Sequence, residues 1–513
     1  MSVHRGSETE EPVSGAKTTG GLSSLRDLRI LPRSLTVTDD AEFGLAHTST
    51  GPQLAILTRN GSARFGGFEG ECAVIKGERL LLGPPSPRNI TALRARLSWL
   101  RPKVLGLSTS VGMGDRLGLA TPGHVRALRA AGGVLAPIFA QQSIREMERT
   151  DRSAQQVMDD AAWGVFAEGW RGGFGADADH LKTPDDIDSC VEAGYTFFTF
   201  DPGEHVDGTA ETAKPSALYA GFERLPWEQL EDSAKALTNR YLEQSFEFAG
   251  HSIGFDERTL FQAAVKYGRA IAHVVALYRH LVRVSGDRDY EVEVSVDETE
   301  TPTTHAQHVY IAGELQRLGV QWVSLAPRYV GRFEKGVDYV GDVAEFEADF
   351  AVHAAIARHF GPYKLSLHSG SDKFSIYPAA VRQTRGLIHL KTAGTSYLEA
   401  LRAIAALDPK LFRAIYRFAR KRYEDERASY HVSASLENAP LPQEVSDADL
   451  PALLEQFDAR EILHVTFGSV LRARTSGDGY SFYNRLMDVL RAHPDTYASN
   501  LEAHFLRHLK PFS

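Results

Sequence analysis

Four polar strings, each at the end of a short apolar run, hold most of the side chains in this chain that could do chemistry. They are GADADH (175–180), SVDETETP (295–302), SLHSGSDKF (366–374) and IHLKTAGT (388–395). Carboxylates, imidazoles and amines are the groups that bind metal ions and transfer protons. If the apolar runs are parallel strands of one barrel, all four strings meet at one rim. The pattern indicates an enzyme.

Histidines beside carboxylates in these strings indicate a metal site. Asp179 and His180 end the first string, and His368 and His389 lie in the third and fourth. A single histidine in an apolar strand is usually a buried structural residue, but three at three strand ends are harder to explain in that way. Imidazole and carboxylate ligands together suit Zn, Mn, Co or Ni. We therefore expect a divalent metal cation near these strand ends.

The second string is a source of acids and bases. Asp297, Glu298 and Glu300 fall within four residues. Carboxylates this close repel one another, so a buried member has a raised pKa unless a cation compensates, and such a group can act as a general acid or base. Carboxylates also favour the start of a helix, here one opened by Thr301-Pro302. Both interpretations stay open for Glu300, and we favour the chemical one for Glu298.

Two lysines near strand ends are candidates for substrate binding. Lys373 and Lys391 could bind a substrate carboxylate or hydroxyls, and Lys391 could instead form a Schiff base. Most lysines in proteins are simply solvated, but a lysine at the end of an apolar barrel strand is a stronger candidate.

An arginine and two glutamines add further candidates. Arg116 lies in a glycine-rich loop, SVGMGDRLG (110–118), which lacks the spacing of a P-loop. It could bind an anion, or form a structural ion pair with Asp115. The string FAQQSIRE (139–146) offers Gln141, Gln142 and a further arginine, Arg145, for sugar hydroxyls.

Eight strand–loop–helix units must position these side chains. The predicted strands are VLGLSTS (104–110), VLAPIFA (134–140), GGFGADAD (172–179), YTFFTFD (195–201), EVEVSVD (291–297), VQWVSLA (320–326), YKLSLHS (363–369) and GLIHLKT (386–392). Thr121, Asp256 and Asp342 are predicted to cap helices between or beside them. Eight such units close a TIM (β/α)8 barrel, with an open doubly wound sheet as the alternative.

Segments outside the barrel units complete the predicted domain organisation. Residues 1–21 are polar and glycine-rich, which predicts a disordered arm. Short strands predict an N-terminal α/β subdomain over 22–100, followed by the catalytic barrel over 101–405. The barrel carries an insertion at 202–290, with a hairpin and a long helix. Residues 406–513 are predicted to form a helical C-terminal lobe.

Composition narrows the class of protein. The chain has 513 residues, of which 43% are hydrophobic and 24% charged. It has only two cysteines, Cys72 and Cys190, which suits a reducing cytoplasm. No apolar stretch reaches the roughly 20 residues that span a bilayer, and the net charge of −9 argues against nucleic-acid binding. We expect a cytoplasmic enzyme for a small molecule, compatible with a homo-oligomer.

Seven strings together resemble the tagaturonate epimerase family, also called tagaturonate/fructuronate epimerases. From about residue 104 to about residue 471 they are, in order, GMGDRLGLATPGHVRAL, FAQQSIRE, GFGADADH, VSVDETETPT, LHSGSDKFSIYP, HLKTAGTSYLEA and HVTFGSVL. The resemblance implies a divalent-metal isomerase of sugar-acid catabolism. It implies Asp179 as proton acceptor, Glu298 as proton donor, and His180, His368 and His389 as metal ligands. Glu298 is the alternative third ligand, in which case His389 donates a hydrogen bond.

The implied reaction has a specific chemical difficulty. Tagaturonate and fructuronate differ at one secondary carbinol, which lies β to the ketone, so the carbonyl does not acidify its C–H bond enough for simple enolisation. A retro-aldol route avoids this, because a base deprotonates the hydroxyl and the adjacent C–C bond breaks to an enediolate and an aldehyde. The aldehyde turns over, and the enediolate adds to its other face. A metal polarises the ketone in this scheme.

Other functions remain as alternatives. A tagatose/fructose 4-epimerase acts on neutral ketohexoses with the same stereochemical problem, and lacks the need for a cation to bind a carboxylate. A class II aldolase-like lyase would release its fragments, and a metallohydrolase would need a first-strand HxH pair that is missing. A barrel that only binds sugar acids for regulation is the non-enzyme alternative.

Overall fold

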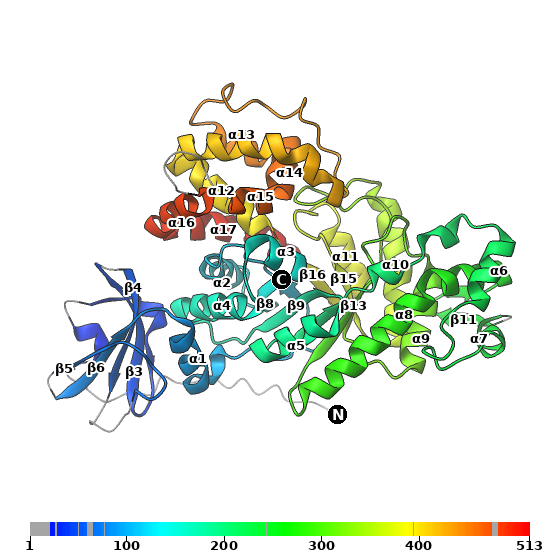
Figure 1. Ribbon diagram of the computed structural model, residues 1–513, viewed down its shortest axis with the longest axis horizontal. Coiled ribbons are helices and arrows are strands. Elements are labelled where there is room, and N and C mark those ends of the chain that lie inside the picture. The colour runs from blue at the N-terminus through cyan, green and yellow to red at the C-terminus, as the bar shows by residue number, and fades with distance from the viewer. Residues whose placement is uncertain are drawn as a thin grey trace, which may run out of the picture. The chain divides into compact units, whose positions relative to one another are not determined.

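The computed structural model describes residues 21–25, 28–49, 51–58, 65–75, 77–242, 244–392, 394–473 and 481–513 (Figure 1). It divides into two compact units, Met1–Ala92 and Leu93–Ser513. The boundary between the units lies within the segment 22–100 that the sequence predicts as one subdomain. Of the predicted arm, all but Gly21 lies outside the described residues.

The first unit contains a six-stranded antiparallel sheet. Its strands are β1 (Arg29–Ile30), β2 (Thr36–Val37), β3 (Ala41–Thr48), β4 (Gly51–Thr58), β5 (Glu71–Ile75) and β6 (Glu78–Gly83). The order is β1-β3-β4-β6-β5, with β2 paired to β3. Apolar side chains from β3, β4 and β6 pack with Leu22 into its core. Helix α1 (Pro87–Arg96) follows and runs across the unit boundary.

The second unit is built on a closed barrel of eight parallel strands, which confirms the predicted TIM barrel. The strands are β7 (Ser110–Gly112), β8 (Ala136–Ser143), β9 (Gly175–Leu181), β10 (Phe197–Phe200), β13 (Glu291–Ser295), β14 (Ser324–Ala326), β15 (Lys364–Leu367) and β16 (Ile388–Lys391). Figure 1 shows them at the centre of this unit with helices around them.

Helices follow the strands as the βα pattern requires. They are α2 (Thr121–Ala130), α3 (Ile144–Thr150), α4 (Ala154–Glu168), α5 (Pro184–Ala193), α9 (His305–Arg317), α10 (Val343–Phe360), α11 (Tyr377–Thr384) and α12 (Thr395–Leu407). Asp342 caps α10 as predicted, but Thr121 is the first residue of α2 and caps nothing. Helix α9 starts later than the predicted Thr301-Pro302, because Thr304 and Gln307 form a capping box there.

Two strand predictions need correction. The first barrel strand lies at 110–112 and not at 104–110, since Gly106 turns the chain with a φ of +60°. The string GADADH does not follow a strand but is itself most of β9. Because side chains alternate along a strand, Asp177 and Asp179 therefore point the same way.

The insertion after β10 contains the predicted hairpin and long helix. Its elements are α6 (Pro215–Glu223), α7 (Ala234–Tyr241), β11 (Ser245–Phe248), β12 (His251–Gly254) and α8 (Glu257–Ser285). Asp256 caps α8 as predicted. The helix carries a buried lysine, Lys266, whose ammonium donates to Glu211, to the Thr301 hydroxyl at 2.9 Å and to the Pro302 carbonyl. The insertion is thereby tied to the end of the acidic string after β13.

The last part of the chain is helical. It contains α13 (Pro409–Glu426), α14 (Phe457–Val465), α15 (Phe467–Arg472), α16 (Phe482–Ala492) and α17 (Pro494–Leu509), and α17 packs against α2 and α12. Among the described residues, no helix combines the length and the apolar character that a membrane crossing needs.

Candidate active site

A buried lysine at the end of β16 joins three carboxylates inside the barrel. The Nζ atom of Lys391 lies 2.6 Å from Asp179 Oδ1, 2.9 Å from Asp177 Oδ2 and 2.8 Å from Glu293 Oε1. It also donates to the Thr199 hydroxyl at 2.6 Å. All three carboxylates are almost completely buried, where unpaired negative charge is costly. Lys391 is the cation that makes their burial tolerable.

The pKa values of this cluster follow from burial and from Lys391. Burial alone would raise the pKa of Asp179 and Glu293, but Lys391 and neighbouring histidines outweigh it and hold both pKa values well below the usual range. For Asp177 burial wins and its pKa is raised. Burial lowers and the carboxylates raise the pKa of Lys391, with the net result well above its ordinary value. A protonated Lys391 is not available as a Schiff-base nucleophile.

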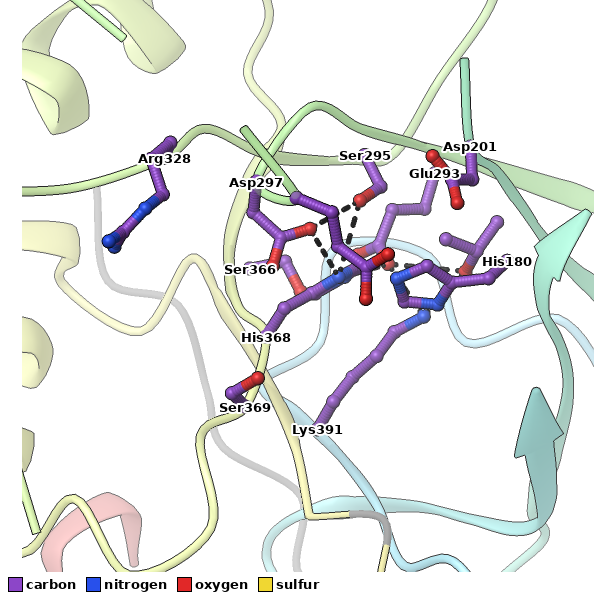
Figure 2. A network of polar contacts seen from close by, with 12 residues as sticks. His180, Asp201, Glu293, Ser295, Asp297, Arg328, Ser366, His368, Ser369 and Lys391 are labelled. Carbon is purple, nitrogen blue, oxygen red and sulfur yellow. Dashed lines mark hydrogen bonds and ion pairs between the residues drawn. The ribbon is translucent and has the colours of Figure 1, made fainter. Parts of the chain in front are cut away.

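Two histidines at the rim, His180 and His368, are oriented by carboxylates of this cluster, and Figure 2 shows both together with Glu293 and Lys391. His180 Nδ1 lies 2.7 Å from Asp179 Oδ1, and His368 Nε2 lies 2.7 Å from Glu293 Oε1. A carboxylate on one ring nitrogen fixes the tautomer and leaves the other nitrogen as a ligand. His180 sits at the end of β9 with a φ of +57°, and its ring centroid is 5.1 Å from that of His368.

A further carboxylate, that of Asp297, lies close to both histidines. His368 Nδ1 lies 3.1 Å from Asp297 Oδ1, in the loop after β13. One donor atom from each of His180, Asp297 and His368 lies within 4.8 Å of the others. A second such group, sharing His180, includes Asp201 and Glu298. Two imidazoles and nearby carboxylates, each held from behind, fit a divalent cation.

His389 lies deeper in the barrel than the other two histidines. It precedes Lys391 by two residues on β16, and its Nδ1 lies 2.9 Å from the Ser110 hydroxyl. Its ring packs 5.3 Å from that of Phe197, and burial lowers its pKa to about 3. Among the described residues it belongs to no group of candidate metal ligands.

Glu298 lies at the edge of the site, in a pocket. Its Oε1 accepts from Arg145 at 3.0 Å, and its side chain is 32% exposed. Burial raises its pKa, but His180, Lys335 and Arg145 more than offset this and lower it overall. The pocket has a volume of about 520 Å³, within the range of small-molecule sites. Its lining also includes Asp297, His368, Arg328, Lys335 and Tyr430.

A small cavity of about 40 Å³ continues from this pocket toward the barrel axis. The two spaces share Lys335, His368 and Ser369 in their linings. The small cavity is also lined by Asp179 and Lys391, so it extends the rim pocket to the buried charge cluster.

Three predicted substrate-binding residues do not face this pocket. Arg116 is buried, donates to Glu146 Oε1 through Nε at 2.8 Å and stacks on Phe467. Gln142 donates to Thr150 and accepts from Arg152, on the outer side of β8. Lys373 donates to the backbone carbonyls of residues 334, 337 and 371. Gln142 and Lys373 are satisfied by groups of the protein itself. Arg116 is paired with Glu146, but its buried Nη1 has no hydrogen-bond partner among the described residues.

The structure selects Gln141 over Gln142 and adds two residues, Lys335 and Arg328, that the sequence analysis did not name. Gln141, which was only an equal alternative to Gln142, lines the small cavity and donates to Asp179 Oδ2 at 3.4 Å. Lys335 donates to the Ser369 hydroxyl at 2.6 Å. Arg328 lines the larger pocket, and Figure 2 shows its guanidinium directed away from the cluster. Among the described residues, no carboxylate forms an ion pair with it. No local motif marks Lys335 or Arg328.

Comparisons with known proteins give consistent matches over almost the whole chain. A family model described as tagaturonate epimerase matches residues 31–512. A tagaturonate/fructuronate epimerase of Thermotoga maritima is 42% identical over 484 residues, which are 94% of this chain and 97% of that protein. The native crystal structure of the fructuronate-tagaturonate epimerase of Cohnella laeviribosi is 37% identical, with a TM-score of 0.88 over 96% of this chain and 97% of that one. A glycerol complex of the same enzyme is 38% identical, with a TM-score of 0.88 over 94% and 96%.

Replacing Lys391 by methionine should reverse the way in which the carboxylate cluster makes the free energy of unfolding depend on pH. The lysine holds the pKa values of Asp179 and Glu293 low in the folded chain. The two carboxylates therefore contribute to the free energy of unfolding above their unfolded pKa values, and this contribution is lost in acid. Without it, burial raises these pKa values above the unfolded ones, and the contribution is lost as pH rises. We expect Lys391→Met to cost about 3–5 kcal/mol at pH 8 and clearly less at pH 5.

Urea unfolding of the metal-free chain at both pH values measures this difference. Lys335→Met is the matched control, because its ammonium contacts a hydroxyl rather than the carboxylate cluster. An equal loss for Lys391→Met at pH 5 and pH 8 would contradict the assigned role.

Proposed function

The chain belongs to the tagaturonate epimerase family, and from that premise we propose that it interconverts D-tagaturonate and D-fructuronate with a bound divalent metal cation. The enzyme is an isomerase of the epimerase class. One observation carries the proposed chemistry: His180, Asp297 and His368 converge at the rim, between Glu298 in the larger pocket and Asp179 in the small cavity that adjoins it. On this geometry Asp297 replaces His389 in the proposed ligand set.

The proposed metal is Zn, Mn, Co or Ni, which suit imidazole and carboxylate ligands. When bound, such a cation polarises the substrate ketone as a Lewis acid and stabilises the negative charge that forms on its oxygen. Glu293 and Asp179 hold the two histidine rings from behind. The protein's own residues do the proton transfer.

Asp179 is the proposed proton acceptor. Its Oδ1 is occupied by Lys391 and His180, while Oδ2 has only the long contact from Gln141 and belongs to the lining of the small cavity. Its depressed pKa keeps it ionised, as an acceptor must be. In the proposed reaction it takes the proton of the carbinol hydroxyl, and the adjacent C–C bond breaks. The electron pair of that bond passes to the ketone-bearing fragment as an enediolate.

Glu298 is the proposed proton donor on the other side of the substrate. After the aldehyde turns over, the enediolate carbon re-forms the C–C bond and the new alkoxide takes a proton from Glu298. Its lowered pKa means that the free enzyme holds it ionised. It must therefore gain its proton once the bound substrate excludes water, since desolvation raises a carboxyl pKa. In the reverse direction the two carboxyls exchange roles.

The substrate carboxylate needs a cation other than the predicted Arg116 and Lys373, which face away. Arg328 is the proposed partner, because it lines the same pocket as Asp297 and Glu298 and forms no ion pair among the described residues. Lys391 pairs with the carboxylate cluster and lines only the small cavity, so we do not assign it to the substrate carboxylate. Because Arg116 and Lys373 do not face the pocket, a tagatose/fructose 4-epimerase that acts on neutral ketohexoses is the second candidate function.

We also propose a cytoplasmic location, supported by two cysteines that are both free in the structure. The homo-oligomeric state remains a prediction.

Removing the metal should abolish turnover. We expect a chain dialysed against a chelator to lose at least about 100-fold in kcat, since Lewis-acid stabilisation is worth several kcal/mol. Adding back Zn, Mn, Co or Ni should restore the rate. An NMR time course on tagaturonate, with metal content measured in the same samples, tests this. Full activity in a chain with less than about 0.1 metal ion per molecule would refute the metal requirement.

Asp179→Asn and Glu298→Gln should each lower kcat by roughly 10²–10⁴-fold, the usual contribution of a general acid or base. Exposed neighbours provide the controls, Asp185→Asn and Glu300→Gln, which should stay close to the unmodified enzyme. Metal content must be unchanged in Asp179→Asn, because its carboxylate also orients His180. An equal loss in Glu300→Gln would mean that the donor is wrongly assigned.

The same NMR assay run in D2O tests the retro-aldol route. The C–H bond at the inverted carbon never breaks in that route, so the product should carry hydrogen there. Deuterium at that carbon would overturn the proposed mechanism and leave the epimerase activity intact.

Arg328→Met should separate the uronate from the neutral sugar. Loss of a charge-assisted pair worth about 1.5–3 kcal/mol should raise KM for tagaturonate roughly 10- to 100-fold. Turnover of tagatose or fructose should change little. Arg332→Met is the control, because that arginine lines the same pocket but pairs with Glu334 at 3.5 Å. If both variants behave alike, or if neutral ketohexoses are the better substrates of the unmodified enzyme, the neutral-sugar alternative gains.

A further inference from the structure

A second cluster of histidine and aspartate lies on the outer helices of the barrel. His305 is the first residue of α9, and Asp349 and His353 stand four residues apart on α10 and thus on one face of it. His305 Nε2 lies 2.9 Å from Asp349 Oδ1, and His353 Nε2 lies 3.6 Å from Asp349 Oδ2. One donor atom from each of the three lies within 4.8 Å of the others. None of these residues lines the pocket of the candidate active site.

Two atoms of this cluster are buried without a hydrogen-bond partner. They are His353 Nε2 and Asp349 Oδ2, and the side chain of His353 is fully buried. A buried polar atom left without a partner costs about 1–3 kcal/mol. At 3.6 Å the pair is too far apart for a hydrogen bond, so a proton does not bridge them well.

The other nitrogen of His353 belongs to a buried hydrogen-bond chain. His353 Nδ1 lies 2.8 Å from His308 Nδ1, and His308 Nε2 lies 2.7 Å from the Tyr363 hydroxyl. If His353 donates from Nδ1, His308 accepts there and can donate from Nε2 to Tyr363. That arrangement leaves a bare lone pair on His353 Nε2, directed at Asp349. Histidines that bind metals usually donate their other N–H in this way.

We propose that His305, Asp349 and His353 form a second metal site, for a borderline divalent cation such as Zn²⁺, separate from the catalytic pocket. Ligands at tetrahedral angles around zinc, with bonds of about 2.0–2.2 Å, lie about 3.3–3.6 Å apart. The 3.6 Å separation of His353 Nε2 from Asp349 Oδ2 agrees with that range, and the 2.9 Å separation of His305 Nε2 from Asp349 Oδ1 is slightly shorter. The side chain of His305 is 34% exposed, so a cation can enter from solvent and keep a water as fourth ligand.

The consequence of such a site is structural. A cation held by His305 and by α10 fixes the start of α9. The loop that carries Asp297 and Glu298 ends at Thr304, the cap of that same helix. The second site therefore stabilises the start of α9 from outside the barrel and makes no contact with the substrate.

Zinc stoichiometry tests the proposal. The full-length chain is stripped with a chelator, incubated with ZnCl2, desalted, and its zinc and protein are measured. We expect His305→Gln to bind about one equivalent less than the unmodified chain and to keep its epimerase activity. Asp349→Asn should lose the same equivalent. His368→Gln should lose a different one, so that the double variant His305→Gln/His368→Gln binds less than either single variant.

His359→Gln is the matched control, because His359 also lies on α10 but outside the cluster. It should bind as much zinc as the unmodified chain. Zinc should also raise the Tm of His368→Gln but not that of His368→Gln/His305→Gln. The proposal is overturned if His305→Gln and Asp349→Asn retain the full zinc content, or if His359→Gln loses zinc equally. These outcomes do not depend on which substrate the enzyme epimerises.

Discussion

The contact of one ammonium group with three buried carboxylates governs the interior of this barrel. Asp177, Asp179 and Glu293 would repel one another strongly in a medium of low polarity, and Lys391 compensates them directly. Two of these carboxylates in turn hold the rings of His180 and His368. The orientation of the rim histidines is therefore set from below, by a charge cluster that is almost completely buried. A rigid support of this kind suits a site that must hold both fragments of a cleaved sugar in place.

The barrel itself could be predicted from the sequence, because eight apolar runs with polar ends have few other solutions. The direction of individual side chains could not. A shift of one residue along a strand reverses the face on which a side chain lies. Gln141 lines the cavity and Gln142 faces outward for this reason, although the two are chemically identical. Arg116 pairs with Glu146, which lies 30 residues away in the sequence, and no local sequence pattern predicts this pair.

The sequence also could not predict how deep inside the barrel each side chain lies. His389 and Lys391 lie on one strand and face the same interior, but only Lys391 reaches the layer of the carboxylate cluster. The sequence shows a histidine at a strand end in both the third and the fourth polar strings. Only the closed barrel shows that His368 lies beyond its strand, near Asp297, while His389 lies within its own. The proposed metal chemistry is unchanged, because the carboxylate of Asp297 can serve as the third metal ligand in place of the imidazole of His389.

Through Lys266, the insertion after β10 also supports the loop that carries Asp297 and Glu298. Its ammonium reaches from α8 to Thr301 and Pro302, so the far end of the acidic loop rests on a helix that is not part of the barrel's repeating pattern. Transplanting this loop into another (β/α)8 scaffold would carry the acids but leave behind the support that sets their position. An engineer who wished to move this chemistry would need to graft the insertion together with the loop, as one inseparable module.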